Sequence, residues 1–292
     1  MRTIDSISPL TQLCGIIGNP VEHSMSPAMH NRAFDVLGLD YVYVAFRVNE
    51  GDVKAALDGM RVLHNFRGLS VTIPHKTAVI EYLDDISEVD AAIGSINTII
   101  NNNGKLRGLG SDGPGARQAL IEGGIPLGQR SVSIIGTGGA SRAIAFDLVH
   151  NAGISRLRLC GILKTELETL AANVSDTTSI PVEAVLIDEI SLARALQTTD
   201  VLINASPVGM HPKMDDTPVP ESMLHPDMGV MDIVYNPLET KLLKAAQALG
   251  CRTVSGLEMF VNQAVMQFES WTGQTAPKNE MRQTVLNRLT NR

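Results

Sequence analysis

Apolar residues fall along this chain in short runs separated by amphipathic stretches and glycine-rich turns, a pattern typical of an α/β fold. The clearest run is Ser131–Ile135, which is apolar and partly β-branched and therefore predicts a buried strand. Gly136, Gly138 and Gly139 follow it directly, and Ala140–His150 then places apolar residues at helical spacing. This stretch predicts a strand, a glycine turn and a helix in immediate succession.

That order is the setting in which a dinucleotide-binding fingerprint is credible. Glycines allow a tight turn and let a pyrophosphate approach the backbone, while the start of the next helix supplies N–H groups and a favourable dipole. Ser141 stands at the third glycine position of the pattern. An ordinary tight turn between a strand and a helix is the alternative interpretation.

Residues 1–112 predict one alternating unit of strands and helices. One helix is predicted over Ser26–Leu37, with Ser26 as its N-cap and Pro27 as its first helical residue, and another over Glu50–Arg61. The cluster Gly113–Gly115 marks the exit from this unit, and Ala116–Glu122 predicts a connecting helix. The predicted strands are Leu13–Gly18, Tyr41–Phe46, Leu69–Ile73, Gly94–Ile100 and Leu106–Gly110.

The glycine turn opens a second unit. Leu238–Leu249 is amphipathic and is followed by Gly250, as expected at the end of a helix. Two further helices are predicted over Gly256–Gly273 and Asn279–Arg292, and because no strand follows them we expect them to pack back on the first unit. The other predicted strands are Leu157–Cys160, Asp200–Ala205, Gly229–Tyr235 and Cys251–Val254.

Composition excludes several classes of protein. The 292 residues are 44% hydrophobic, with a net charge of −7 and no basic tract, which argues against a nucleic-acid surface. No apolar run approaches the ~18 residues of a membrane span, and the N-terminus MRTIDSISPL lacks the core of a signal peptide. Cys14, Cys160 and Cys251 are odd in number and far apart, which favours reduced thiols in a cytoplasmic protein.

Polar residues of the first unit are candidates for chemistry. Ser24 and Ser26 place two hydroxyls at a turn between a strand and a helix, where they bind a polyol or carboxylate or only cap the helix. Lys76 follows a predicted strand, where open α/β sheets place their chemistry; the alternative is a solvated surface lysine. His23 and His30 have no third ligand nearby, which argues against a metal site.

Eight short segments span most of the chain in order: GNPVEHSMSPAMHN (18–31), SVTIPHK (70–76), GSINTI (94–99), SDGPG (111–115), GTGGASRA (136–143), INASPVGM (203–210), DIVYNPLET (232–240) and GLEMFVNQA (256–264). Together they resemble the shikimate dehydrogenases, including the related quinate/shikimate dehydrogenases. The resemblance implies an N-terminal substrate-binding domain over 1–113, with a mixed, mainly parallel sheet. It also implies a Rossmann-like NAD(P)-binding domain over 114–255, C-terminal helices (256–292) that return to the first domain, and an active site in the cleft between the domains.

The resemblance also implies the reaction, a reversible hydride transfer between NADP(H) and a ring carbon that bears a hydroxyl. Reduction of 3-dehydroshikimate to shikimate is the direction used in chorismate and aromatic amino acid biosynthesis. Lys76 and Asp112 match the catalytic pair, which of them carries the proton stays open, and no metal is required because the nicotinamide supplies the hydride. The positions that match substrate-binding residues are Ser24, Ser26, Ser70, Thr72, Asn97, Tyr235 and Gln263. Those that match cofactor-binding residues, or lie where a phosphate could be reached, are Gly136, Thr137, Gly138, Gly139, Ala140, Ser141, Arg142, Lys164, Ala205, Ser206, Met210, Gly256 and Met259.

Three departures from the family pattern bear on specificity. Ser70 replaces the usual Asn, and Gly110-Ser111 replaces Asn-Thr before Asp112, so quinate or another cyclic polyol acid is an alternative substrate. Gly161-Ile162-Leu163 replaces the Asn-Arg-Thr whose arginine binds the 2′-phosphate of NADP, but no acidic residue replaces it there. The sequence favours NADP(H) over NAD(H), and it is compatible with a monomer or a homodimer.

Overall fold

The structure, a computed structural model, describes residues 7–290. The chain forms two compact units, one of residues 1–111 with 263–292 and the other of residues 112–262. The sequence places the divisions after residues 113 and 255 instead. Part of the N-terminal stretch considered for a signal peptide, and the last two residues of the predicted helix Asn279–Arg292, lie outside the described residues. Within residues 7–290, no helix is long and apolar enough to cross a membrane.

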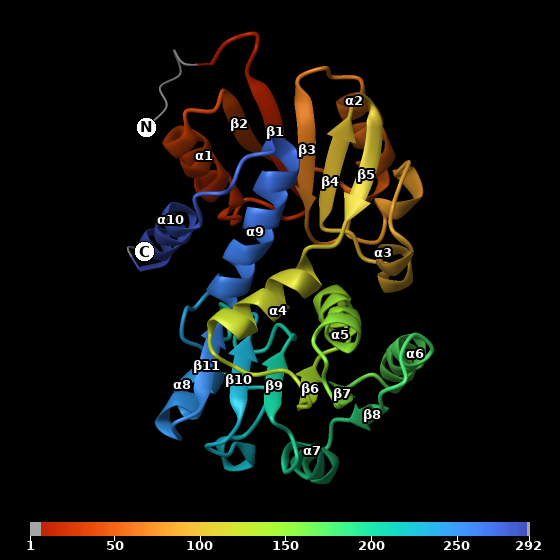
Figure 1. Cartoon of the computed structure of the whole chain (residues 1–292), viewed down its shortest axis with the longest axis vertical. Helices are drawn as coiled ribbons and strands as arrows, with labels where there is room; N and C mark the ends of the chain where they lie inside the picture. Colours follow the sequence, from red (N-terminus) through yellow and green to blue (C-terminus); the bar gives the residue numbers. More distant parts are fainter. Residues whose placement is uncertain (1–6, 291–292) are drawn as a thin grey trace. The chain divides into compact units, whose positions relative to one another are not determined.

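A five-stranded mixed sheet organises the first unit (Figure 1). Its strand order is β2-β1-β3-β4-β5; the first three strands are parallel, and β4 runs antiparallel to both neighbours. Its central strands are buried on both faces, which explains their apolar runs. The strands are β1 (Gln12–Gly18), β2 (Tyr41–Arg47), β3 (Phe66–Val71), β4 (Thr98–Asn102) and β5 (Lys105–Leu109).

Helices cover this sheet through apolar contacts. Leu57 of α2 packs in one cluster with Ile17 and Leu69 of the sheet. Phe34 of α1 stacks on Phe268 of α9, with ring centroids 5.3 Å apart. The helices of this unit are α1 (Ser26–Leu37), the 3₁₀ turn Glu50–Asp52 leading into α2 (Val53–Arg61), the 3₁₀ turn Ile80–Tyr82, α3 (Glu88–Ile93), α10 (Lys278–Thr290) and the end of α9 (Gly256–Thr272).

Helix α9 is anchored to β4 and to the residue before it, Asn97, by two side chains one turn apart. The indole Nε1 of Trp271 donates to the carbonyl of Ile99 at 3.0 Å, and Nε2 of Gln267 donates to the carbonyl of Asn97 at 3.3 Å. Gly68 lies beneath the indole, where a Cβ would come within 2.3 Å of Nε1. The prediction that the C-terminal helices pack on the first unit is therefore confirmed from residue 263 onward.

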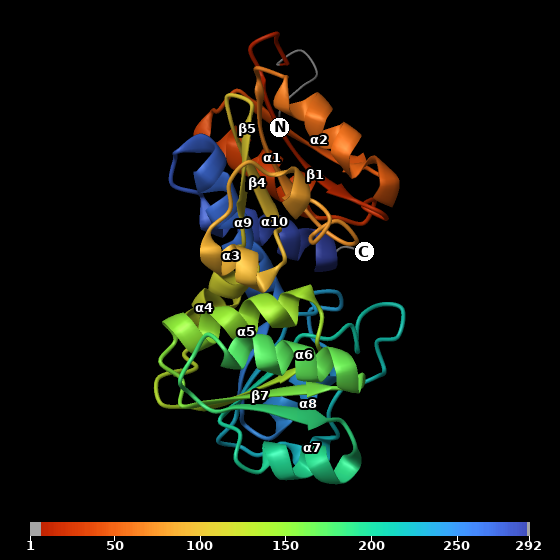
Figure 2. The same ribbon diagram turned by 90° about the vertical axis from the view of Figure 1, so that its right-hand side faces the viewer.

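The second unit is a doubly wound sheet of six parallel strands in the order β11-β10-β9-β6-β7-β8 (Figures 1 and 2). Figure 2 shows α5 and α6 on one face of this sheet and α7 on the other. The strands are β6 (Ser131–Ile135), β7 (Arg156–Gly161), β8 (Val182–Leu186), β9 (Val201–Asn204), β10 (Gly229–Asp232) and β11 (Arg252–Ser255). The helices are α4 (Asp112–Glu122), α5 (Gly139–Asn151), α6 (Lys164–Ser175), α7 (Glu189–Leu196), the 3₁₀ turn Glu221–Met223, α8 (Lys241–Ala248) and the start of α9.

The predicted N-cap of α1 is wrong. Ser26 is the first helical residue, and Met25 occupies the N-cap without a capping side-chain bond. The hydroxyl of Ser24 instead accepts a hydrogen bond from the N–H of Ser26 at 3.2 Å. The hydroxyl that accepts from a backbone N–H at the start of α1 thus belongs to Ser24, two residues before the predicted Ser26.

Other boundaries also differ from prediction. Strand β3 begins at Phe66, before the predicted Leu69, because Gly68 is tolerated under Trp271. It ends at Val71, before the predicted Ile73. Asn97 precedes β4 instead of lying inside a strand. The Gly113–Gly115 cluster does not break the chain but lies in the first turns of α4, where proline is accepted. Helix α8 begins only after Thr240, whose hydroxyl caps it by accepting from the N–H of Leu243.

Candidate functional site

The glycine turn after β6 is closely fixed by its surroundings. Gly136 has a φ of +111°, and a Cβ there would lie 3.0 Å from the carbonyl oxygen of Ala205. Its N–H donates to the carbonyl of Cys160 at 2.8 Å, which holds the turn against β7. Only glycine combines this backbone conformation with this lack of space.

Helix α5 begins directly after the turn. Its N-cap, Gly138, has an extended backbone, and no side chain caps the first turn. Helix geometry leaves the first N–H groups without partners inside the helix, so this end suits an anion. Ser141 is fully buried and its hydroxyl donates to the carbonyl of Gly136 at 2.6 Å, which explains how serine replaces the third glycine.

Strands β6 and β9 are neighbours, and the chain leaves them toward opposite edges of the sheet. Ligands of open α/β sheets bind outside the carboxyl ends of the strands at such a switch point. The predicted cofactor-binding residues 136–142 follow β6, and Ala205 and Ser206 follow β9. The structure thus brings these two predicted groups to one place.

The segment after β7 is apolar and exposed. The side chain of Ile162 is 75% exposed and that of Leu163 is 54% exposed. Lys164 begins α6 and faces Glu168 across an exposed ion pair of 3.8 Å. Residues 161–163, where the resemblance implies an arginine for a 2′-phosphate, are Gly161, Ile162 and Leu163.

Glu166 is an acidic residue of this region that the sequence analysis did not assign. Its carboxylate accepts a hydrogen bond from the hydroxyl of Thr137, in the glycine turn, at 3.1 Å. An acidic residue near this turn is able to accept hydrogen bonds from ribose hydroxyls and opposes a 2′-phosphate. Its place in the first turn of the helix after β7 is the sequence signal that could have identified it.

Asp232 forms hydrogen bonds that connect the ends of β9 and β10 with the residues that follow β10. Its carboxylate accepts from Thr240 Oγ1 at 2.6 Å, Asn204 Nδ2 at 2.9 Å and the N–H of Val234 at 3.0 Å. The same Asn204 accepts through Oδ1 from the hydroxyl and the N–H of Ser206. Burial raises the pKa of Asp232 to about 6, although these hydrogen bonds oppose the shift.

This raised pKa predicts a pH-dependent stability. Between the ordinary value near 3.8 and about 6, the folded chain holds a proton at Asp232 that the unfolded chain has lost. Protonation of Asp232 therefore adds about 3 kcal/mol at most to the free energy of unfolding. This stabilisation is complete below pH 4 and is lost as the pH rises through 6. Asp232→Asn should lack this pH-dependent stabilisation. The free energy of unfolding of wild type, measured with urea, should therefore exceed that of the variant by more at pH 4.5 than at pH 7.5.

Asp216→Asn, at an exposed loop position, is the control and should leave the pH profile unchanged. A constant difference between wild type and Asp232→Asn across this range would contradict the raised pKa of Asp232.

In the first unit, four of the predicted substrate-binding residues and the predicted catalytic Lys76 lie at one edge of the mixed sheet. Ser24 and Ser26 follow the carboxyl end of β1, and Thr72 and Lys76 follow that of β3. Asn97 precedes the antiparallel β4, so it lies at the same edge. The strand directions alone therefore bring these five positions together.

The turn that carries Lys76 is held by backbone hydrogen bonds. The N–H of Thr72 donates to Ile17 at 3.0 Å, and the carbonyl of Lys76 accepts from the N–H of Ile96 at 2.8 Å. Gly18 has no side chain because the methyl of Thr72 occupies that space. Lys76 belongs to the first compact unit, and Asp112, which is buried, is the first residue of the second.

Two glutamines of α9 differ in their surroundings. The predicted Gln263 is half-buried, whereas Gln267, one turn later, is buried and bonded to Ser70, Asn97 and Thr98. Sequence reasoning missed Gln267 because the helical pattern alone does not separate the two.

The remaining predicted residues belong to the second unit. Tyr235 follows β10 and stacks on Phe260, with ring centroids 4.9 Å apart. Gly256 starts α9, where a Cβ would lie 2.2 Å from the carbonyl oxygen of Ile233. Met259 is buried and Met210 is half exposed.

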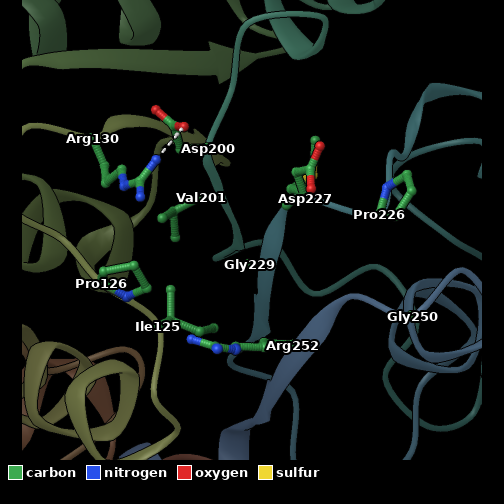
Figure 3. A pocket seen from close by; sticks show the side chains of 11 residues that line it. Ile125, Pro126, Arg130, Asp200, Val201, Pro226, Asp227, Gly229, Gly250 and Arg252 are labelled. Atoms are coloured by element: carbon green, nitrogen blue, oxygen red, sulfur yellow. Dashed lines mark hydrogen bonds and ion pairs between the residues drawn. The ribbon is translucent and has the colours of Figure 1, made fainter.

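Neither a metal site nor a pyrophosphate site in the cavity at the amino ends of β9 and β10 is supported by the structure of residues 7–290. Among residues 7–290, no group of three or more His, Cys, Asp or Glu side chains could hold a metal ion. A cavity of about 280 Å³ lies at the amino ends of β9 and β10, away from the glycine turn (Figure 3). Its charges have both signs, and Arg130 pairs there with Asp200 at 3.1 Å, so it does not suit a pyrophosphate.

The doubly wound sheet with its glycine turn is of the type that binds dinucleotides, and the other unit presents hydroxyl, amide and lysine side chains at one sheet edge. The model of the "Shikimate dehydrogenase substrate binding domain" matches residues 16–99, and that of the "Shikimate 5'-dehydrogenase C-terminal domain" matches residues 256–286. The shikimate dehydrogenase (NADP(+)) of Moorella thermoacetica is 42% identical over 91% of this chain and 90% of its own. That of Methanopyrus kandleri is 41% identical over 97% and 98%. The chain belongs to the shikimate dehydrogenase family.

Solved structures are similar over almost the whole chain. A shikimate dehydrogenase in complex with NADP+ is 37% identical, with a TM-score of 0.89 over 97% of both chains. The shikimate 5-dehydrogenase of Listeria monocytogenes, in complex with shikimate and NAD, is 34% identical, with a TM-score of 0.89 over 96% of this chain and 98% of its own. The quinate dehydrogenase of Corynebacterium glutamicum, in complex with NAD, is 33% identical, with a TM-score of 0.87 over 95% and 99%.

Proposed function

We propose that this chain catalyses the reversible, NADP(H)-dependent reduction of 3-dehydroshikimate to shikimate, a step of chorismate and aromatic amino acid biosynthesis in the cytoplasm. The observation that carries this proposal is the 41% identity over 97% of the chain to the shikimate dehydrogenase (NADP(+)) of Methanopyrus kandleri. This coverage is too large to be confined to one of the two units.

The second unit fits a nicotinamide dinucleotide. The uncapped start of α5 offers N–H groups to a pyrophosphate, and the backbone at Gly138 is open, because no atom beyond its two chain neighbours lies within 4 Å of the place of a Cβ. Ala205 and Ser206 would line the same site from β9. When bound, the cofactor supplies or accepts the hydride.

Lys76 and Asp112 are the residues we assign to proton handling. During reduction, a negative charge develops on the carbonyl oxygen, and Lys76 either donates a proton to it or stabilises it as a fixed positive charge. Asp112 forms a hydrogen bond with the resulting hydroxyl. Ser24 and Ser26 hold the substrate carboxylate, with Tyr235 near it, and the ring hydroxyls are held by Thr72, Asn97 and Gln263.

A second function is favoured by the segment after β7. Ile162 and Leu163 offer no cation to a 2′-phosphate, Lys164 is paired, and Glu166 lies beside the glycine turn. These features suit NAD(H), which is the cofactor in the quinate dehydrogenase structure from Corynebacterium glutamicum. The alternative is therefore a quinate/shikimate dehydrogenase that uses NAD(H) in quinate catabolism.

A four-way steady-state assay separates these functions. It measures kcat/KM for shikimate and for quinate, each with NADP+ and with NAD+. We expect the value for shikimate with NADP+ to exceed the other three by at least about tenfold, or about 1.4 kcal/mol of transition-state discrimination. A preference for NAD+ or for quinate would support the second function, and absence of turnover in all four would contradict both.

A further inference from the structure

Six polar side chains of the first unit form one buried network of hydrogen bonds. None is more than 6% exposed. Buried polar groups are costly unless they are paired, so a complete network of this kind holds its members in one arrangement. Its members are Tyr43, Ser70, Asn97, Thr98, Ser111 and Gln267.

The strand register explains why these residues meet. Ser70 on β3 and Thr98 on β4 are directly paired across the antiparallel ladder. Gln267 of α9 reaches both of them, since Ser70 Oγ donates to its Oε1 at 2.8 Å and its Nε2 donates to Thr98 Oγ1 at 3.1 Å. The network thus joins the sheet to the C-terminal helix.

Backbone groups fix the direction of the bonds at Gln267. The carbonyl oxygen of Asn97 only accepts, so the Gln267 atom 3.3 Å from it is the amide nitrogen. The amide oxygen therefore faces Ser70, and Ser70 must donate to it. Tyr43 Oη in turn donates to Ser70 Oγ at 2.7 Å, so the hydroxyl proton of Ser70 is used within the protein.

A second backbone group fixes Asn97. The N–H of Ser111 only donates, so the Asn97 atom 2.8 Å from it is Oδ1. The same oxygen accepts from Ser111 Oγ at 3.1 Å and from Thr98 Oγ1 at 3.0 Å. Three donors exceed the two lone pairs of an amide oxygen, so Oδ1 of Asn97 has no lone pair left for a ligand, and a ligand that contacts this amide does so through its N–H groups.

We propose that Ser70, Gln267, Thr98 and Ser111 are positioning residues that present Asn97 to the substrate solely as an N–H donor. This inference rests on the proposed function, in which Asn97 holds a ring hydroxyl. That hydroxyl accepts from Asn97 through its oxygen, and its own hydrogen goes to another acceptor. Ser70 and Ser111, two of the departures from the family pattern, therefore act together through one amide and not as separate substrate contacts.

Thr98 offers the sharpest test because it is fully buried and links both halves of the network. Thr98→Val keeps the shape and removes the hydroxyl. We expect the KM for shikimate to rise about tenfold, the effect of losing one hydrogen bond, with little change in kcat or in the KM for NADP+. Thr98→Ser keeps the hydroxyl and should restore the wild-type KM.

Ser111→Ala is a second variant, for use if Thr98→Val does not fold, and it should shift the KM for shikimate in the same direction. A lower melting temperature with an unchanged KM in either variant would mean that the network only stabilises the fold, and would overturn the proposal. Wild-type turnover is measured first. Absence of turnover with shikimate would contradict the proposed function itself. Wild-type turnover together with an unchanged KM for shikimate in both variants would contradict only the proposed role of the network.

Discussion

Replacement of Lys76 by methionine is expected to lower kcat for shikimate oxidation by about 10²- to 10⁴-fold. Methionine keeps much of the length of the side chain but can neither carry a proton nor hold a positive charge. The KM for NADP+ should not change, because the residues assigned to the cofactor belong to the other compact unit. Steady-state kinetics with shikimate and NADP+ measure both quantities.

A matched control is Lys54→Met, which changes an exposed lysine of α2 that pairs with Asp58. Its activity should equal that of wild type. If Lys76→Met also retained its turnover, the assignment of Lys76 to the reaction would be wrong.

Lys76→Arg separates the two roles that the chemistry allows. Arginine keeps the positive charge but does not release a proton at ordinary pH. An activity of Lys76→Arg close to that of Lys76→Met would identify Lys76 as the proton carrier. Substantial activity would identify it as a fixed charge that stabilises the developing oxyanion.

The turn that carries Lys76 also shows what the sequence could predict. Strong local signals gave reliable elements: β6 has the bounds Ser131–Ile135 that its apolar run predicts, and α5 follows the glycines. Here strand, turn and helix depend on residues close together in the chain, so a single sequence contains the necessary information. The end of the strand before Lys76 was predicted less well, because β3 ends at Val71, two residues before the predicted Ile73.

Features that depend on distant residues were missed. The start of β3 was placed too late, because Gly68 suggests no strand until Trp271 is seen to fill the space above it. Gln267 could not be distinguished from Gln263, because only the packing of α9 against β4 buries it. The edge strand β8 carries half-exposed residues and gave no clear apolar run.

The candidate site shows the same division between local and distant information. The family motifs identified Asn97, Ser70 and Ser111 as positions of interest. Only the structure shows that the two serines bond, directly or through Gln267 and Thr98, to the same amide. Hydrogen-bond direction was beyond the sequence, because it follows from which backbone groups face each amide.

Replacement of Gly136 by alanine is the second prediction with a large effect. The φ of +111° is strained for any residue with a side chain, and the new methyl would press on the backbone of Ala205 and Ser206, at 3.0 and 3.2 Å. We expect a loss of about 1–3 kcal/mol from the strained backbone alone. Relief of the contact should also displace the turn and weaken NADP+ binding. Urea unfolding and a titration with NADP+ measure the two effects.

Gly138→Ala is the matched variant that separates folding from binding. Gly138 has φ −74° and ψ −177°, which alanine adopts freely, and no atom beyond its two chain neighbours would lie within 4 Å of the methyl. Alanine is less favourable than glycine at a helix N-cap, but it also restricts the unfolded chain, so we expect the two effects to oppose each other and the stability to change less than in Gly136→Ala. The Kd for NADP+ should still rise, since the methyl would occupy space that the proposal gives to the pyrophosphate. Unchanged NADP+ binding in Gly138→Ala would place the cofactor elsewhere, even if Gly136→Ala were destabilised as expected.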